Sequence, residues 1–164
     1  MSEKVTDIRF GGIKRLYGHQ QFDWLQEAHF CVVGIGGVGS WTAEALARTG
    51  VGKITLIDLD DICATNVNRQ IHALTGTIGQ AKVDAMKARC ELINPQCQVH
   101  VIDDFITLDN IQEHIQGFDY VIDCIDAVKE KAALIAHCKR NKLPIITTGG
   151  AGGQTDPSQI TYGD

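Results

Sequence analysis

Four glycines stand close together early in the chain, between an apolar run and a helical pattern. They are Gly34, Gly36, Gly37 and Gly39, in the spacing G-x-G-x-x-G. Glycine permits a tight turn, and the backbone N–H groups of such a turn can approach phosphate oxygens at the positive end of the helix that follows. The pattern therefore predicts a nucleotide-binding loop, with a tight turn that holds no ligand as the alternative.

Two carboxylates follow the next apolar run. Asp58 comes directly after residues 54–57, and Asp60 lies two residues further along. An acidic residue at the end of the second strand of a nucleotide-binding unit accepts hydrogen bonds from ribose hydroxyls. We therefore expect Asp58 and Asp60 to be among the nucleotide-binding residues.

Amide and cationic side chains occur shortly downstream. Asn66 and Arg69 follow the second apolar run, and Lys82 opens the next helical pattern. A guanidinium and an ammonium group neutralise the charge that develops on β- and γ-phosphates. Asp126 follows a later strand and can hold Mg²⁺ that bridges the phosphates. This set favours ATP over NAD, although an NAD-dependent oxidoreductase remains an alternative.

The six histidines show no metal-ligand spacing. His72 is close to Arg69 in the sequence, so it is a candidate for approaching the phosphates. A surface or packing role is the ordinary alternative for each histidine.

Apolar runs alternate with helical patterns along the chain. The expected strands are 30–33, 54–58, 99–102, 120–123 and 144–148, and the expected helices are 40–48, 79–94, 108–115 and 128–141. Strands that are apolar throughout and alternate with helices are typical of a parallel sheet covered on both faces. The sequence therefore predicts an α/β fold, a Rossmann-like three-layer domain with a mainly parallel sheet.

The domain organisation follows from these elements. Residues 1–29 are expected to form an N-terminal helical segment, and residues 30–160 the Rossmann-like ATP-binding adenylation domain. Residues 161–164 follow a stretch rich in Pro, Gly and Ser, and we expect them to begin a missing C-terminal part.

Composition narrows the classes of function. Fifteen basic and twenty acidic side chains give a net charge of −5, so no global positive field indicates DNA binding. A local basic groove for RNA is compatible with an acidic total. The six cysteines form no C-x-x-C pair, which leaves zinc without support and is typical of a reduced, cytoplasmic protein.

Five short segments carry a family resemblance. They are 34–40 (GIGGVGS), 56–60 (LIDLD), 66–70 (NVNRQ), 79–82 (GQAK) and 123–126 (DCID). Together they resemble the adenylating domain of the E1-like, ubiquitin-activating-type enzymes, over about residues 9–160. The resemblance implies an E1-like adenylation fold in which ATP activates a carboxylate.

The resemblance also assigns roles. It implies that the glycine loop and Asp58 hold ATP, and that Asn66 orients the phosphates. Arg69 and Lys82 would neutralise the phosphates, and Asp126 would bind Mg²⁺. Arg69, Lys82 and Asp126 are therefore the expected catalytic residues.

Within these enzymes, segments 9–18, 66–73 and 147–154 look most like the family of tRNA threonylcarbamoyladenosine dehydratases. That likeness implies a tRNA carrying threonylcarbamoyladenosine as substrate, with its carboxylate adenylated and then cyclised. It further suggests a homodimer. Two more features that the resemblance implies are a bound monovalent cation and a sulfur-transfer partner protein, and no residues are assigned to either.

Two further functions remain open. One is adenylation of the C-terminus of a ubiquitin-like sulfur-carrier protein, against which the lack of paired C-x-x-C motifs argues. The other is a nucleotide-binding module without catalysis.

Overall fold

A computed structural model of the chain describes residues 8–150, 152–153 and 155–163. Five strands form one sheet in the order β3-β2-β1-β4-β5, and every neighbouring pair is parallel. The strands are β1 His29–Val33, β2 Lys53–Ile57, β3 Gln98–Ile102, β4 Tyr120–Asp123 and β5 Ile145–Thr147. The expected mainly parallel α/β sheet is confirmed.

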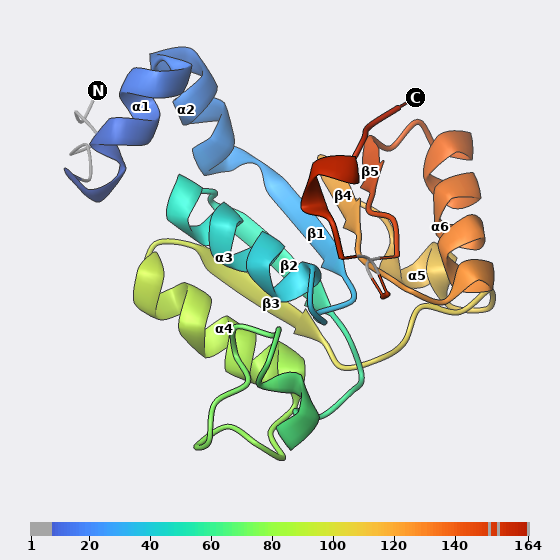
Figure 1. Cartoon of the computed structure of the whole chain (residues 1–164). Helices are drawn as coiled ribbons and strands as arrows, with labels where there is room; N and C mark the ends of the chain where they lie inside the picture. The colour runs from blue at the N-terminus through green and yellow to red at the C-terminus, as the bar shows by residue number, and fades with distance from the viewer. Residues whose placement is uncertain (1–7, 151, 154, 164) are drawn as a thin grey trace.

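Helices connect and precede the strands (Figure 1). The α-helices are α1 Gly11–Tyr17, α2 His19–Glu27, α3 Gly39–Thr49, α4 Lys82–Ile93, α5 Ile111–His114 and α6 Val128–Arg140. The 3-10 helices are η1 Ile8–Phe10, η2 Ala64–Asn66 and η3 Pro157–Gln159. The helices α1 and α2 both fall within the segment expected to be helical, and β1 begins at its end.

Alternate side chains of the strands face two separate cores, because successive residues of a strand point to opposite faces. Val32 and Leu56 pack on one face with apolar residues of α3 and α4. Cys31 and Ile57 pack on the other face with residues of α5 and α6. The sheet is thus the middle layer of three, as the sequence predicts.

The helices α3 and α4 are joined by an ion-pair cluster around one buried carboxylate. Glu44, on α3, accepts hydrogen bonds from Arg48 Nε at 2.7 Å and from Arg89 Nε of α4 at 2.5 Å. Burial alone would raise the pKa of Glu44, but the two arginines outweigh it and hold the pKa below its ordinary value. This pairing fixes the helix that follows the glycine loop against its neighbour.

Two helices begin later than predicted, since the helix expected from residue 108 begins at Ile111 and the one expected from residue 79 is also shortened. The helix expected from residue 79 begins at Lys82, because the residues before it pair with the loop after β2. Ile62 N–H donates to Gln80 O at 2.9 Å, and Ala81 forms an antiparallel bridge with Asp61. The extended backbone of Ala81 cannot belong to a helix, so this short pairing delays the helix start.

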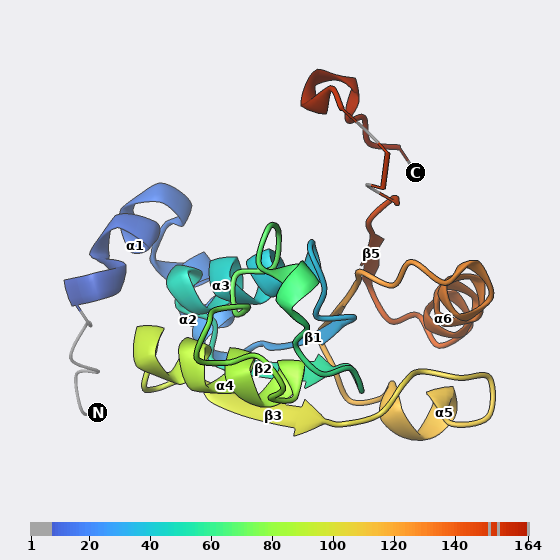
Figure 2. The ribbon, with the colours of Figure 1, turned by 60° about the horizontal axis from the view of Figure 1, so that its bottom comes forward.

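The segment after β5 leaves the sheet. In Figure 2 the described residues beyond β5 run away from the parallel strands toward η3. Ile160 and Tyr162 in this segment are exposed. The candidate functional side chains are therefore positioned by the sheet and by the loops at its carboxyl edge.

The turn between α3 and β2 provides a test of this packing. A Cβ at Gly52 would lie 1.8 Å from the carbonyl oxygen of Gln26, which is backbone and cannot rotate away. We expect Gly52→Ala to lower the free energy of unfolding by about 3 kcal/mol. Thermal denaturation should show a decrease in Tm of about 6–12 °C. Gly76→Ala is the control, since nothing lies within 4 Å of the added methyl group, and its Tm should stay near that of the unaltered chain.

Candidate nucleotide-binding site

The glycine loop lies between β1 and α3, at the carboxyl edge of the sheet. Gly34 has a φ of +86°, and its N–H donates to Ile57 O at 2.9 Å. A Cβ at Gly34 would lie 2.9 Å from Cys124 O, and one at Gly39 would lie 1.7 Å from Gly34 O. Backbone thus closes around the loop on both sides, and glycine is required at these two positions.

Both backbone groups of Ile35, inside the loop, are held by buried side chains. Ile35 N–H donates to Asp58 Oδ2 at 2.6 Å, and His72 Nε2 lies 2.9 Å from Ile35 O. Because a carbonyl oxygen can only accept, Nε2 of His72 carries the proton. Ile35 is 0% exposed and His72 is 2% exposed, so water does not compete for either bond.

His72 is held in its neutral form. Burial is the main cause that lowers the pKa of His72 from the ordinary 6.5, and the charge of Lys82 adds to the effect. The hydrogen bond to Ile35 O and the nearby Asp58 act in the opposite direction but are outweighed. Nδ1 of His72 has no hydrogen-bond partner among the described residues, which is consistent with a ring that carries one proton.

Asp58 also shapes the turn after β2. Its second oxygen, Oδ1, accepts the N–H of Asp60 at 2.9 Å and lies 4.0 Å from Lys82 Nζ. Lys82 Nζ donates to Asp60 Oδ2 at 2.6 Å. The structure therefore brings together three residues that the sequence predicts for the site, with the ammonium group held between two carboxylates. Asp60 is half-exposed, whereas Asp58 and Lys82 are buried, so Asp60 presents the more accessible carboxylate.

Arg69 packs along the outside of the glycine loop. Its Cδ lies 3.4 Å from the position that a Cβ on Gly37 would take. Its Nη1 donates to Thr65 O at 3.1 Å and to Asn68 Oδ1 at 2.9 Å. The guanidinium group is exposed and next to the loop, and in this structure it is hydrogen-bonded to its own turn.

Asn66 builds the turn that carries Arg69. Its Oδ1 accepts the N–H of Cys63 at 2.9 Å, and its backbone carbonyl accepts the N–H groups of Arg69 and Gln70. Asn66 is buried, so the contacts observed for it hold the loop in shape. Its predicted contact with phosphate stays a prediction.

Asp126 lies on the other side of the glycine loop, in the segment after β4. The two residues before it pass against Gly34, since Ile125 N lies 3.3 Å from the position of a Gly34 Cβ. Asp126 is exposed and has no hydrogen bond or ion pair within the described residues. A free carboxylate at this edge fits the oxygen ligands that Mg²⁺ prefers.

A buried ion pair that was not predicted from the sequence fixes the loop after β4. Asp123 is 0% exposed, and its Oδ2 accepts from Lys131 Nζ at 2.7 Å. Lys131 Nζ also donates to Thr148 O at 3.1 Å, which ties the ends of β4 and β5 together. The signal in the sequence was an acid that ends an apolar run, with a lysine eight residues later. In the sequence, Asp123 stands out only as part of the segment 123–126.

Two further findings concern only the described part of the chain. No group of three or more His, Cys, Asp or Glu side chains there is placed to hold a metal ion by itself. No helix in the described residues is long and apolar enough to cross a membrane.

The profile of the ThiF family matches residues 12–164. The chain belongs to the ThiF family. This membership confirms the predicted E1-like adenylating family, and the segments that carried the prediction are those that surround the site described above.

Known relatives of this ThiF-family chain are close. It is 61% identical over 168 residues to the tRNA threonylcarbamoyladenosine dehydratase of Escherichia coli K12, covering 100% of this chain and 63% of that protein. A crystal structure of the Escherichia coli enzyme in complex with ATP has a TM-score of 0.93 at 59% identity, and covers 98% of this chain and 67% of the other. Its complex with AMP gives a TM-score of 0.92 at 60% identity, covering 98% of this chain and 68% of the other. This chain thus spans under two thirds of the curated relative's length.

The hydrogen bond between His72 and Ile35 generates a prediction. His72→Leu leaves a buried carbonyl without a donor and should lower the free energy of unfolding by about 1–3 kcal/mol. His72→Gln places an amide N–H near the position of Nε2 and should recover most of that loss. Equal stability of the two variants, measured by urea denaturation at pH 7.5, would contradict the role of this bond.

The pH dependence of stability gives an independent readout. The pKa of His72 is lower in the folded than in the unfolded chain, so the unfolded chain binds more protons below about pH 6.5. Stability should therefore fall as the pH decreases from about 6.5 toward the folded pKa. Burial also lowers the pKa of His29, which acts in the same direction. The difference between the unaltered chain and His72→Gln isolates the contribution of His72.

Proposed function

We propose that this chain binds ATP at the glycine loop and uses it to dehydrate N6-threonylcarbamoyladenosine in tRNA. In the first step, a carboxylate oxygen of the modified base attacks the α-phosphorus and pyrophosphate leaves. In the second step, an internal nucleophile of the same side chain attacks the activated carbonyl carbon, closes the ring and displaces AMP. The observation that carries the proposal is the 61% identity to a named dehydratase over the whole chain.

The site supports adenylation through position and charge. A carboxylate and a triphosphate repel each other, so the protein must hold both in line and offset their charge. Arg69 borders Gly37 with an exposed guanidinium group that can turn from Asn68 to a phosphate oxygen. Lys82 would have to exchange its bond to Asp60 for one to phosphate. No side-chain nucleophile is needed, because the acyl group is attacked within the substrate.

Magnesium is part of the proposal. Asp126 would hold Mg²⁺ against the phosphates, where the ion supplies positive charge to the leaving pyrophosphate. Asp58 and Asp60 would accept hydrogen bonds from the ribose hydroxyls, and Asp60 presents the more exposed carboxylate. A monovalent cation is a further proposed ligand, with no residues assigned to it.

The setting of the enzyme is also proposed. A homodimer follows from the family resemblance, as does a sulfur-transfer partner protein. A cytoplasmic location suits the free cysteines of the described residues and a tRNA substrate.

Mass analysis of tRNA nucleosides tests the function directly. The chain is incubated with ATP, Mg²⁺ and tRNA that carries threonylcarbamoyladenosine, and the digested nucleosides are compared with those of a reaction without ATP. We expect the modified nucleoside to lose one water only when ATP is present. Unchanged nucleosides, together with ATP–pyrophosphate exchange stimulated by a ubiquitin-like carrier protein, would favour the sulfur-carrier alternative instead.

The two cations give a quantitative prediction. Arg69→Ala and Lys82→Ala should each lower turnover by about 10²–10³-fold, the effect of losing one preorganised charge contact. Lys87→Ala is the matched control, because Lys87 lies on the same helix with its Nζ 3.9 Å from Glu91. Single-turnover rates of nucleoside conversion measure the effect. Rates near that of the unaltered chain for both Arg69→Ala and Lys82→Ala would remove the assigned phosphate roles.

A further inference from the structure

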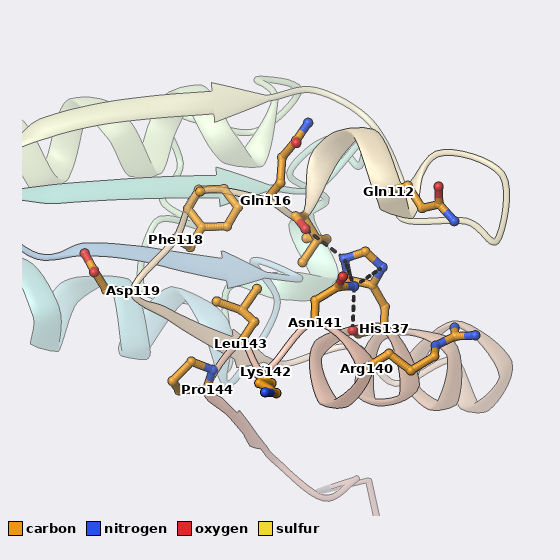
Figure 3. A pocket seen from close by; sticks show the side chains of 12 residues that line it. Gln112, Gln116, Phe118, Asp119, His137, Arg140, Asn141, Lys142, Leu143 and Pro144 are labelled. Carbon is orange, nitrogen blue, oxygen red and sulfur yellow. Dashed lines mark hydrogen bonds between the residues drawn. The ribbon is translucent and has the colours of Figure 1, made fainter.

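A second hollow lies at the amino edge of the sheet, opposite the glycine loop. It has a volume of about 770 Å³ and lies between α5 and the end of α6, where the chain enters β4 and β5 (Figure 3). Gln112 and Gln116 lie on one wall, and Arg140 and Lys142 lie on the other. Nothing in the proposed adenylation site uses these residues.

The positive charge at this hollow has no partner in the described part of the chain. Arg140 and Lys142 are exposed, and no ion pair involves either of them within the described residues. Arg140 Nε donates to Ala136 O of its own helix at 3.1 Å, which leaves the Nη groups toward solvent. Because the whole chain carries a net charge of −5, a hollow lined by two unpaired cations and one carboxylate is more positive than the chain as a whole.

Lys142 occupies a backbone position that normally requires glycine. Its φ is +55°, and it is the described non-glycine residue with a positive φ. It follows the C-cap of α6, where the N–H of Leu143 donates to Cys138 O at 2.9 Å and closes the helix end. Glycine fits such a left-handed helix terminus at lower free energy than lysine does. A residue that lies in a strained turn and also lines a hollow is a candidate for a functional role at that hollow.

The ordinary explanation covers only part of this arrangement. A cation near a helix C-terminus interacts favourably with the helix dipole, which accounts for Arg140. It does not account for Lys142, since glycine at that position would relieve the strain of the turn. Asp119 also lines the hollow, and the N–H of His29 that its Oδ2 accepts at 2.8 Å does not cancel its charge, so the two cations leave an excess of positive charge rather than an unopposed one. The hollow is therefore positive at one wall and rich in amide groups at the other.

We propose that this hollow binds the phosphodiester backbone of the tRNA whose modified nucleotide is presented at the glycine loop, an inference that rests on the proposed function. The helix α6 connects the two places, since Asp126 lies just before its first residue and Arg140 is its last. Thirteen helical residues span about 20 Å. An RNA that places one nucleotide at the catalytic edge continues as a polyanion over such a distance.

The lining favours RNA over an acidic protein partner. Contacts to nucleic-acid backbones come from Lys and Arg together with Gln and Asn side chains, and they position the RNA without reading its sequence. Lysine is instead depleted at the centre of protein–protein interfaces, which are aromatic and apolar. Phe118 is the aromatic side chain of the hollow, and it is only partly exposed.

Binding of tRNA at several salt concentrations tests the inference. The variants are Arg140→Gln, Lys142→Gly and the double variant, and the control is Lys139→Gln. Lys139 carries the same charge on the same helix turn but does not line the hollow. The slope of log affinity against log salt is about −0.7 per phosphate contact, so each lost contact should weaken binding about fivefold near 0.1 M salt. The slope should become shallower by about 0.7 for each phosphate contact that a variant loses. Lys139→Gln should change neither the tRNA affinity nor the slope.

Lys142→Gly separates binding from folding. Because glycine relieves the strained turn, this variant should have a Tm equal to or above that of the unaltered chain while its tRNA affinity falls. Unaltered ATP affinity in every variant supports a role confined to RNA. If all variants bind and convert tRNA like the unaltered chain, the inference is overturned and the proposed function stands. If the unaltered chain binds no tRNA, or the variants lose binding only to a carrier protein, both are overturned.

Discussion

The backbone of Ile35 is the point on which the site depends. Its N–H and C=O are each held by a buried side chain, Asp58 on one side and His72 on the other. A loop of four glycines has high conformational freedom, and these two bonds hold one residue of it in place. Since Asp58 comes from the end of β2 and His72 from the turn after η2, the loop takes its shape from the adjacent strand and its connection.

Two lysine–carboxylate pairs lie on either side of the glycine loop and have similar positions relative to their strands. After β2, Lys82 at the first turn of α4 donates to Asp60. After β4, Lys131 in the first turns of α6 donates to Asp123. A lysine near a helix N-terminus is disfavoured by the helix dipole, so each ammonium group needs a carboxylate close by. The pairs join the end of each strand to the helix that follows it, and so they fix the walls of the site on both sides.

The sequence was sufficient for the fold and for the position of the glycine loop, because both depend on local patterns. Apolar runs that alternate with helical spacing predicted the sheet, and G-x-G-x-x-G predicted a tight turn between β1 and α3. The hydrogen bonds from Asp58 and His72 to the backbone of Ile35 were not predictable, because both join segments more than 20 residues apart in the sequence. The start of α4 was missed for a related reason, since a bridge between Asp61 and Ala81 overrides the helical pattern. The same limit applies to Lys142, whose left-handed backbone has no signal in a lysine-rich helix end.

The charge at the carboxyl edge is the physical reason for including a divalent cation in the proposal. The described side chains around the loop include four carboxylates, Asp58, Asp60, Asp123 and Asp126, and three cations, Arg69, Lys82 and Lys131. Two of those cations are already paired with carboxylates, so the protein alone presents a slightly negative surface to a triphosphate. The proposed Mg²⁺ ion would bring two positive charges to this edge and would reverse the sign of the local charge. Asp126 is the carboxylate in this group without a partner within the described residues, so under the proposal it would receive the ion without breaking a bond that holds the loops.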